Sequence, residues 1–400
     1  MTVTTDGPAG GPLTGIQVLD FSTVISGPIC SQALGDLGAD VVKVEPPLGD
    51  PARYSGAPFR EPGFSAFLAQ FNRNKRSLAL DLKREAARAV ARRLAERADV
   101  LLENFRPGVT DRLGIGWAEL RAVNPRLVYC SICGFGSDGP DVDRPAYDHV
   151  IQAITGLMPT QGEVSAPRLI QGGVADKATG MTAQAAILAA LFARERSGSG
   201  QRVEIPMLDA YAAFALPEAM FAGTFPPLTS DAPGVNDVFR TFATTDGFVV
   251  GLTIQDAQFR GLCRVLGRED MADDPRFAEL GPRFQNYREL CDVLAVEIAK
   301  HPTAELIARC RKEGAPFAAV NDLDSFLADP QVANNRTVVE VEDPRFGATR
   351  YLRHPARYET TPATLRRHAP RLGEHSAEIL GEAGFTEAEI QALRSDDVIR

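Results

Sequence analysis

The chain has 400 residues, 44% of them hydrophobic and 24% charged, and its formal net charge is −9 at pH 7. This composition predicts a globular protein of about two domains with a large core. The acidic balance argues against nucleic acid or an anionic membrane as a partner, and the sequence shows neither a membrane-spanning apolar run nor a signal peptide. Six scattered cysteines favour a reduced, cytoplasmic protein over a disulfide scaffold.

The first fifty residues predict a β-α-β unit. A buried strand at 16–21 is followed by a helix at 27–37, and a second strand at 41–45 ends at two prolines. Alternation of strands and helices continues to about residue 206, which predicts a parallel sheet with helical crossovers. The further elements predicted in this half are an extended piece at 77–82, an amphipathic helix at 84–98, a short helix carrying Arg112, and strands at 99–104, 127–132 and 201–205.

The composition changes after residue 216, where prolines and scattered glycines indicate a linker. Asp246-Gly247 then marks the turn of a hairpin, and helices are predicted near 256–266, 288–299 and 303–313. The predicted fold is therefore α/β, with a large Rossmann-like domain built on a parallel sheet and a smaller α+β domain. The predicted divisions are a disordered tail at 1–14, the N-terminal part of the large domain at 15–216, a linker at 217–236, the small domain at 237–314, and a return segment with C-terminal helices packing on the large domain at 315–400.

The most informative stretch runs from Gly172 to Gly180 and continues as a long apolar run to Phe192. Strong helix formers fill that run, so Asp176 is expected at or next to the N-terminus of a buried helix. One interpretation makes Asp176 an ordinary N-cap. The other makes it a covalent nucleophile, with its carboxylate form favoured by the helix dipole and nearby glycine N–H groups available to an oxyanion. Position alone leaves both interpretations open.

Several motifs point to other chemistry and are weak. The glycines at 134–139 match a dinucleotide fingerprint, but prolines follow where a helix should open, so a turn is favoured over an NAD site. Cys130 and Cys133 lie three apart on a predicted strand, where side chains point to opposite faces. The five histidines lack metal-ligand spacing, and no nucleophile elbow of a serine hydrolase is present.

Four cations follow predicted strand ends, at the rim where open α/β sheets bind ligands. Together in an acidic protein they favour a phosphate-bearing ligand, although each alone is compatible with solvated surface charge. These cations are Arg53, Lys83, Arg106 and Arg112.

Several motifs, in order, resemble the family III coenzyme A transferases, the group that includes formyl-CoA transferase, carnitine CoA-transferases and α-methylacyl-CoA racemases. The resemblance runs from about Gly15 to the C-terminus. The stretches that match the family are 18–21, 27–28, 38–45, 74–77, 99–108, 112–114, 133–136, 174–180, 197–201 and 372–375.

The resemblance implies an acyl-CoA:carboxylate CoA-transferase in which Asp176 is the nucleophile and forms aspartyl anhydride and aspartyl-CoA thioester intermediates. It implies acyl-CoA and a carboxylic acid as substrates, no metal or NAD, and a homodimer whose chains interlock. Tyr147 is the other expected catalytic residue. The expected coenzyme A contacts are Ile25, Ser26, Leu80, Asp81, Lys83, Asn104, Phe105, Arg106, Arg112 and Asp148.

Departures from the family bear on the reaction. The racemases carry a histidine where this chain has Tyr147, and a phenol with a pKa near ~10 is a poor base at neutral pH, so racemisation is the alternative rather than the prediction. An NAD-dependent oxidoreductase and a non-catalytic CoA-binding protein are remoter alternatives. The sequence does not identify the two carboxylic acids between which coenzyme A would be transferred, and the pattern specific for oxalate is weak. Candidate cations for a substrate carboxylate are Arg53, Arg168 and Arg240.

Overall fold

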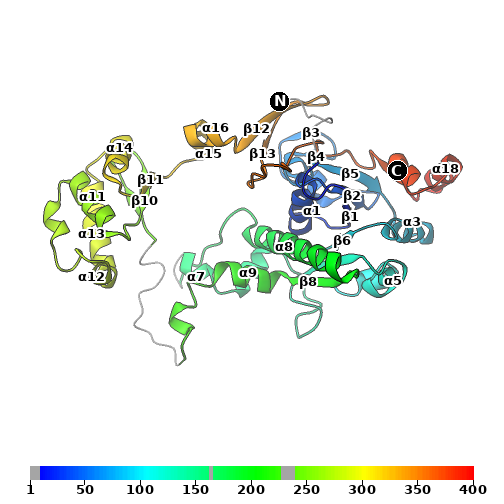
Figure 1. Cartoon of the computed structure of the whole chain (residues 1–400), viewed down its shortest axis with the longest axis horizontal. Coiled ribbons are helices and arrows are strands. Elements are labelled where there is room, and N and C mark those ends of the chain that lie inside the picture. Colours follow the sequence, from blue (N-terminus) through cyan, green and yellow to red (C-terminus); the bar gives the residue numbers. More distant parts are fainter. Residues whose placement is uncertain (1–9, 162–164, 227–238) are drawn as a thin grey trace. The chain divides into compact units, whose positions relative to one another are not determined.

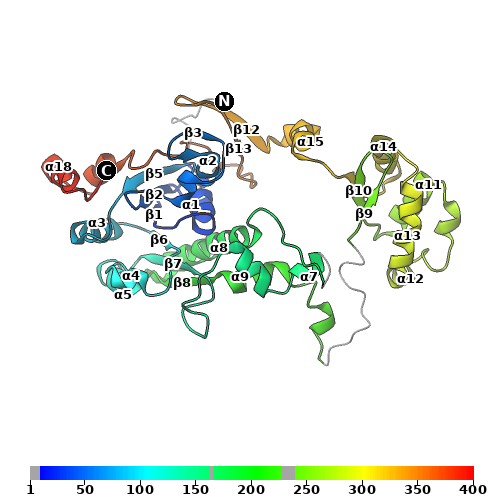
Figure 2. The same cartoon turned by 180° about the vertical axis from the view of Figure 1, so that it is seen from behind.

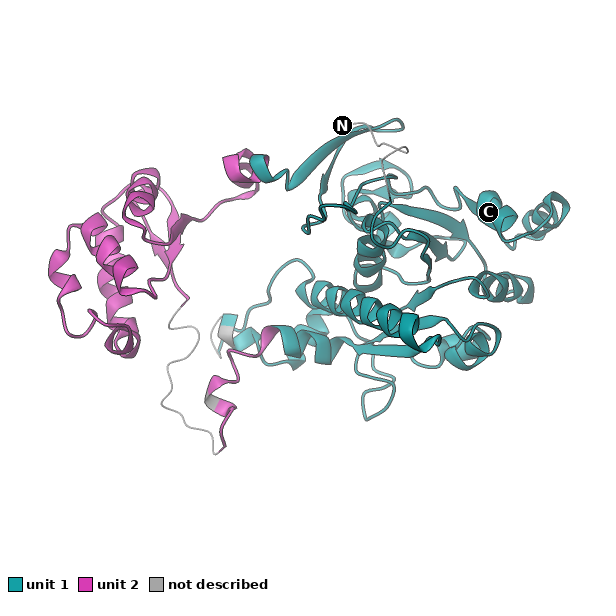
Figure 3. Cartoon of the chain, viewed as in Figure 1, with its two compact units in different colours: residues 1–214, 334–400 teal, residues 215–333 magenta. Residues whose placement is uncertain are grey.

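The computed structural model describes residues 10–161, 165–226 and 239–400. The chain divides into two compact units, residues 1–214 with 334–400 and residues 215–333, which Figure 3 colours separately. The predicted tail at 1–14 lies outside the described residues as far as residue 9, and the predicted linker at 217–236 lies outside them from residue 227.

The first unit carries a parallel sheet and its covering helices (Figures 1 and 2). Its elements are β1 (Gln17–Asp20), α1 (Ser26–Asp36), β2 (Asp40–Glu45), η1 (Pro51–Tyr54), β3 (Phe59–Glu61), β4 (Phe64–Ser65), α2 (Ala66–Phe71), β5 (Lys75–Ala79), α3 (Glu85–Ala95), β6 (Val100–Glu103), α4 (Val109–Arg112), α5 (Trp117–Val123), β7 (Val128–Cys133), α6 (Asp148–Ile154), α7 (Met158–Gln161), α8 (Val174–Ser197), β8 (Arg202–Pro206), α9 (Met207–Ala215), β12 (Val338–Asp343), β13 (Gly347–Leu352), α17 (Ser376–Glu382) and α18 (Glu387–Ser395).

The six strands of the main sheet follow the order β5-β2-β1-β6-β7-β8, and every neighbouring pair is parallel. The chain builds outward from β1 through β2 to β5 and then returns to the other side of β1 with β6. The order therefore reverses between β1 and β6. In open α/β sheets, the carboxyl edge at such a reversal is where a crevice forms and ligands bind.

Both faces of the sheet are buried, as expected for parallel strands. One face packs on α3, α5, α17 and α18 through a cluster that includes Leu19, Val42, Leu101, Val90 and Leu380. The other face is covered by α1 and α8, which also pack on each other. The helix α8 begins after Gly173 (φ 67°) and ends at Gly198 (φ 73°), two left-handed positions that suit glycine.

Buried ion pairs lie beneath the carboxyl ends of β1 and β2. Lys75 Nζ lies 3.1 Å from a carboxylate oxygen of Asp20, and both side chains are fully buried. Burial alone raises the pKa of Asp20, but Lys75, Lys43 and hydrogen bonds from Ser22 and Ser31 bring it down to about 2. The opposite charges compensate one another inside the domain. Removal of one side chain would leave its partner as an uncompensated buried charge.

The C-terminal segment covers the outer side of β5, the strand at one end of the sheet. His375 N donates to Ser77 O, and Asp81 N donates to Val398 O. An antiparallel bridge joins Leu80 to Ile399. Residues that are far apart in the sequence thus complete the hydrogen bonding of the edge strand. In Figure 1 the red C-terminal segment lies beside β5.

The second unit is a small α+β domain with a sheet of order β11-β10-β9. β9 and β10 pair antiparallel across the predicted Asp246-Gly247 turn. Its helices pack on a core that includes Phe242, Val249 and Phe259. The elements are η2 (Phe221–Gly223), β9 (Thr241–Ala243), β10 (Phe248–Gly251), α11 (Asp256–Leu266), η3 (Glu269–Ala272), α12 (Leu280–Gln285), α13 (Tyr287–Ile298), α14 (Thr303–Glu313), β11 (Phe317–Ala319), α15 (Leu323–Ala328) and α16 (Pro330–Asn335).

Candidate active site

A cavity of about 220 Å³ opens at the carboxyl edge of the main sheet. Its wall includes Thr23 after β1, Asn104 after β6, Gly134 after β7 and Met207 after β8. The cavity therefore lies where the strand order reverses, as the topology requires. Six residues predicted from the sequence line it together, namely Ser26, Asn104, Phe105, Arg106, Tyr147 and Asp176.

Asp176 is the third residue of α8 rather than its N-cap, which corrects the simpler interpretation of the sequence. Its carboxyl group is largely buried in the cavity wall. Burial and the neighbouring charge of Asp148 raise the pKa of Asp176 to about 6, while a hydrogen bond with Ser26 and the charge of Lys177 lower it. The carboxylate is thus ionised at neutral pH and more basic than an exposed one, which favours nucleophilic attack.

The side-chain carboxylate of Asp148 caps the N-terminus of α8. Its Oδ1 accepts hydrogen bonds from the backbone N–H groups of Ala175 (2.6 Å) and Asp176 (3.1 Å). Gln152 fixes the other oxygen, because its Nε2 donates to Asp148 Oδ2 at 2.6 Å. The free N–H groups at this helix end are therefore bonded to Asp148, and the pKa of Asp176 is raised by burial and by the charge of Asp148.

A close crossing of α8 and α1 sets the position of Asp176. A Cβ atom on Gly180 would lie 2.5 Å from Ser26 O and 2.3 Å from Ile29 Cγ2, so only glycine fits there without displacement. Gly180 lies one turn after Asp176 in α8. The crossing therefore brings Ser26, at the start of α1, to the carboxyl group of Asp176.

Asn104 joins two sides of the cavity. Its Oδ1 accepts from Thr23 N at 2.9 Å, and its Nδ2 donates to Thr23 O at the same distance. This double hydrogen bond holds the loop after β1 against the end of β6. Among the described residues, the exposed guanidinium of Arg106 has no hydrogen-bond or ion-pair partner, so it is available to an anionic group in the cavity.

Six of the predicted contacts lie outside the cavity wall, namely Asp148, which caps α8, and Leu80, Asp81, Lys83, Arg112 and Ile25. Leu80, the residue after β5, lies in the core and is 1% exposed. Beside it, Asp81 N donates a hydrogen bond to Val398 O. Lys83 and Arg112 are exposed side chains. Ile25 precedes α1, and its Cδ1 would lie 3.1 Å from a Cβ atom placed on Gly173.

Two of the candidate cations for a substrate carboxylate are already paired. Arg53 is 1% exposed, and its guanidinium donates to both oxygens of Glu45, at 2.7 and 2.6 Å. Arg240 pairs with Asp292 in the second unit. The sequence placed Arg53 on the ligand rim, but burial and this bidentate pair remove it from any ligand. By contrast, sequence analysis did not predict Thr23, Cys133 and Met207 in the cavity wall, although each lies within three residues of a strand end.

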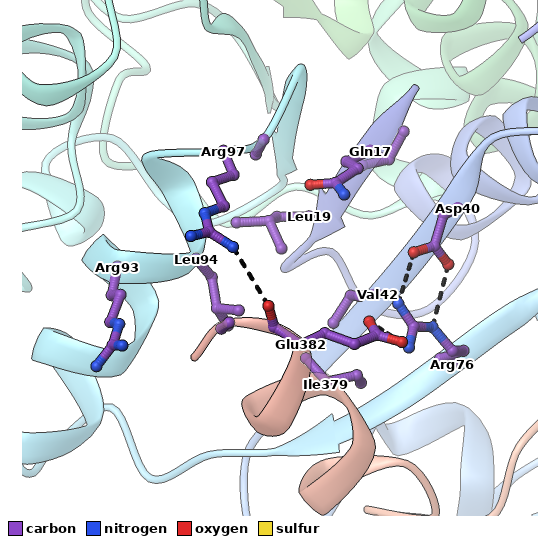
Figure 4. A pocket seen from close by; sticks show the side chains of 13 residues that line it. Gln17, Leu19, Asp40, Val42, Arg76, Arg93, Leu94, Arg97, Ile379 and Glu382 are labelled. Carbon is purple, nitrogen blue, oxygen red and sulfur yellow. Dashed lines mark hydrogen bonds and ion pairs between the residues drawn. The ribbon is translucent and has the colours of Figure 1, made fainter. Parts of the chain in front are cut away.

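A smaller cavity of about 70 Å³ lies at the amino ends of the strands, opposite the carboxyl edge, against α17 (Figure 4). Its charges are engaged within the protein. Arg76 pairs with Asp40, Glu378 and Glu382 at 2.5, 2.9 and 2.8 Å, and Arg97 donates to the backbone oxygen of Glu382. These contacts anchor the C-terminal helices, and the cavity is structural.

Within residues 10–161, 165–226 and 239–400, no group of three or more histidine, cysteine, aspartate or glutamate side chains is arranged to hold a metal ion. No helix in those ranges is long and apolar enough to cross a membrane. The chain turns through residues 134–147, and the next helix begins at Asp148 rather than at Gly139.

Comparisons with known proteins agree with this architecture. The family model described as CoA-transferase family III matches residues 13–376. The chain is 36% identical over 381 residues to the succinate–glutarate CoA-transferase of Agrobacterium fabrum, covering 93% of this chain and 95% of that protein. It is 34% identical over 409 residues to the formyl-CoA:oxalate CoA-transferase of Streptomyces avermitilis, with coverage of 97% and 99%.

Solved structures show the same fold. A CaiB/BaiF family protein from Brucella suis superposes with a TM-score of 0.80 at 34% identity, covering 94% of this chain and all of that one. A protein from Mycobacterium tuberculosis superposes with a TM-score of 0.82 at 33% identity, covering 92% and 99%.

Proposed function

The chain belongs to CoA-transferase family III, and from that premise we propose that it transfers coenzyme A between carboxylic acids through covalent intermediates on Asp176. Transfer of CoA from an acyl-CoA to a carboxylate is the activity supported for the family as a whole. The observation that carries the proposal for this chain is the place of Asp176, a largely buried carboxylate in a cavity at the strand-order reversal.

The proposed reaction begins when a carboxylate oxygen of Asp176 attacks the thioester carbonyl of an acyl-CoA. The C–S bond breaks, CoA leaves as a thiolate, and a mixed anhydride remains on Asp176. The thiolate then attacks the aspartyl carbonyl, which releases the first acid and leaves an aspartyl-CoA thioester. The incoming carboxylate attacks this thioester to form a second anhydride, and the thiolate attacks the new acyl carbonyl, which restores free Asp176. One thioester is exchanged for another, so this series of reaction steps needs no net energy source.

The cavity residues suit these steps. Ser26 holds the carboxyl group of Asp176 in place, and Asn104 stiffens the wall between β1 and β6. Arg106, whose guanidinium has no partner in the part of the chain that the structure describes, offers a cation to a substrate carboxylate or to a developing oxyanion. We assign the exposed cations Lys83 and Arg112 to the phosphates of coenzyme A, together with the segment Leu80–Asp81 that precedes Lys83 in the chain.

Tyr147 is assigned a hydrogen bond to the acyl group, because its ring lies in the cavity wall. Racemisation would need a base that removes an α-proton. His149 stacks on Tyr147 with ring centroids 6.0 Å apart, but among the described residues no histidine lines the cavity that holds Asp176. This supports transfer over racemisation.

We also propose that two chains interlock as a homodimer. Large apolar side chains are exposed along α8 and α9 of the first unit: Met181 (63%), Phe192 (65%) and Phe214 (61%). Exposed apolar side chains gathered on neighbouring helices support a protein partner at this surface. All six cysteines are buried and none forms a disulfide bond, which supports a reducing compartment such as the cytoplasm.

Trapping of the intermediate tests the covalent route. The protein is mixed with a panel of acyl-CoAs, quenched with hydroxylamine and digested. We expect a hydroxamate mass shift on the peptide that contains Asp176, and no shift in Asp176→Asn. A hydroxamate on another carboxylate would reject the assignment. Loss of α-deuterium from a 2-methylacyl-CoA without any hydroxamate would favour the racemase instead.

A further inference from the structure

A buried glutamine lies behind Asp176 and reaches it only through another residue. Gln152 belongs to α6 and is 2% exposed. It does not line the cavity that holds Asp176, and the proposed reaction gives it no part. Burial of an amide is unfavourable unless its donors and acceptor are hydrogen-bonded, so the partners of Gln152 show what its burial achieves.

The Gln152 amide is fully engaged with two neighbours. Its Nε2 donates to Asp148 Oδ2 at 2.6 Å and to the backbone oxygen of Ile170 at 3.0 Å. Its Oε1 accepts from the backbone N–H of Ile170, also at 3.0 Å. Because a carboxylate only accepts hydrogen bonds, it is the nitrogen of the amide that faces Asp148. Ile170 is thus bonded at both its N–H and its C=O, as in a pair of antiparallel strands.

These contacts hold the chain on both sides of the turn that leads into α8. Residues 167–173 carry neither helix nor strand, and both glycines in that stretch have left-handed backbone angles, φ 95° and 67°. Gln152 holds Ile170 before the glycines, and Asp148 holds two N–H groups of the first turn of α8 after them. Asp148 and Gln152 are four residues apart, so a single turn of α6 clamps the start of α8.

Glutamine suits this position because the clamp needs two donors and an acceptor without a charge. A carboxylate would bring a second negative charge to Asp148 and could not donate to it. An ammonium group would offer no acceptor to the N–H of Ile170. Asparagine has the same amide on a side chain that is one methylene shorter, so it could not span both neighbours of Gln152 in their present positions.

The clamp also controls the charge beside Asp176. Burial and then the charge of Asp148 raise the pKa of Asp176, whereas Ser26 of α1 and Lys177 of α8 lower it. Asp148 is half-buried, and without Gln152 its carboxylate could turn toward solvent. The N–H groups at the start of α8 would then favour the ionised form of Asp176. The other titratable side chains of the cavity wall are Arg106, Cys133, Arg144 and Tyr147.

We propose that Gln152 is a positioning residue of the transferase reaction. Through Asp148 and Ile170 it fixes the first turn of α8, so that the Asp176 carboxylate meets the thioester carbonyl in one orientation. The assignment rests on the proposed function. Its effect passes through those two neighbours, because Gln152 itself does not line the cavity.

Gln152→Met tests the proposal, because methionine is a similarly long side chain that forms none of the three hydrogen bonds. We expect kcat to fall at least about tenfold while KM for the acyl-CoA stays within about twofold, since the nucleophile is misaligned but the binding surface is kept. The pKa of Asp176 should also fall. Carbon-13 NMR of protein labelled in its aspartate carboxyl groups measures that titration without turnover, and the signal that is lost in Asp176→Asn identifies the group.

Gln32→Met is the matched control. Gln32 is a buried glutamine of α1, 6% exposed, and its Oε1 accepts from Arg73 N at 3.1 Å. This variant should lose thermal stability but keep the natural kcat, KM and Asp176 titration. Gln152→Asn is a milder second variant that should lower kcat and shift the titration in the same directions, and it provides the test if Gln152→Met does not fold.

An unchanged kcat with an unmoved Asp176 titration in the Gln152 variants overturns the inference. A tenfold rise in KM, or the same effects in Gln32→Met, also overturns it, because the cavity or the fold would then be responsible. A shifted titration without a hydroxamate on Asp176 of the natural chain would reject the covalent mechanism and leave the clamp standing. A labelled Asp176 with no effect of the Gln152 variants would reject only this inference.

Discussion

At the scale of the residue, Asp176 must satisfy two opposed requirements. A nucleophile has to be ionised, but burial and Asp148 favour its neutral form and raise its pKa from 3.8 to about 6. The folded chain therefore binds this proton more tightly than the unfolded chain does. Stability from this group is greatest when it is protonated, falls as pH rises through the range between these two values, and is lost above about pH 6.

Removal of the charge should therefore stabilise the protein while abolishing its activity. In Asp176→Asn we expect an increase of roughly 1–2 kcal/mol in the free energy of unfolding at pH 7.5, allowing for partial solvent screening, and a transfer rate reduced at least about a thousandfold. Urea denaturation at pH 7.5 and pH 4 measures the first effect, which should nearly vanish at the lower pH. Destabilisation at pH 7.5, or an equal gain at both pH values, would contradict the account.

The groups around Asp176 should move the acid limb of the pH–rate profile in opposite directions. Transfer is expected to fall as pH drops through about 6, because protonation removes the nucleophile. Ser26→Ala removes a hydrogen bond that lowers the pKa, so its limb should shift to higher pH. Asp148→Asn removes a charge that raises the pKa but keeps a capping oxygen, so its limb should shift to lower pH. Profiles of kcat/KM measure both, and shifts in the same direction would contradict the assignment.

At the scale of the element, the crossing of α8 and α1 at Gly180 positions the site. In Gly180→Ala the new methyl group would overlap Ser26 O and Ile29 Cγ2, and the helices would have to separate. We expect a loss of about 1–3 kcal/mol in unfolding free energy and a fall in kcat, since Asp176 lies one turn away.

Gly381→Ala is the control for this change, because Gly381 lies in α17 with no atom within 4 Å of the added Cβ. It should stabilise the chain by roughly 0.5–1 kcal/mol, because alanine replaces glycine inside a helix. Thermal or urea unfolding, together with kcat, measures both variants. Equal effects of the two substitutions would show that helix propensity, rather than the crossing, controls the result.

The helices and strands were largely predictable from local sequence pattern, whereas the segments that they pair with or pack against were not. Periodicity and breakers predicted α3, α8, α11 and α14 and the hairpin at Asp246-Gly247. The strand order was not predictable, because the return from β5 to the far side of β1 is not encoded in any short stretch. Local pattern placed Asp176 correctly in the first turn of α8. The capping of α8 by Asp148 and the pairing of Arg53 with Glu45 join residues through tertiary contact, so neither was predictable from local pattern.

At the scale of the whole molecule, the exposed apolar side chains of α8 and α9 predict self-association. Light scattering after size exclusion should give twice the chain mass of 43.1 kDa at micromolar concentration. Phe192→Glu should weaken the dimer, because it places a charge in the proposed apolar contact. Val296→Glu, on an exposed position of α13, is the comparison, and its mass should not change. A mass of 43.1 kDa for the unaltered protein would reject the interlocked dimer.

The covering of β5 by residues 375–400 sets the timing of assembly on the ribosome. The strand emerges early, but its outer hydrogen-bonding partners are synthesised last, after the whole of the second unit. At roughly 5–20 residues per second, the strand waits on the order of half a minute. During that interval an unpaired strand edge is open to strands of other nascent chains. A chain truncated before residue 375 would keep that edge bare permanently, so premature termination should yield insoluble protein rather than a smaller folded one.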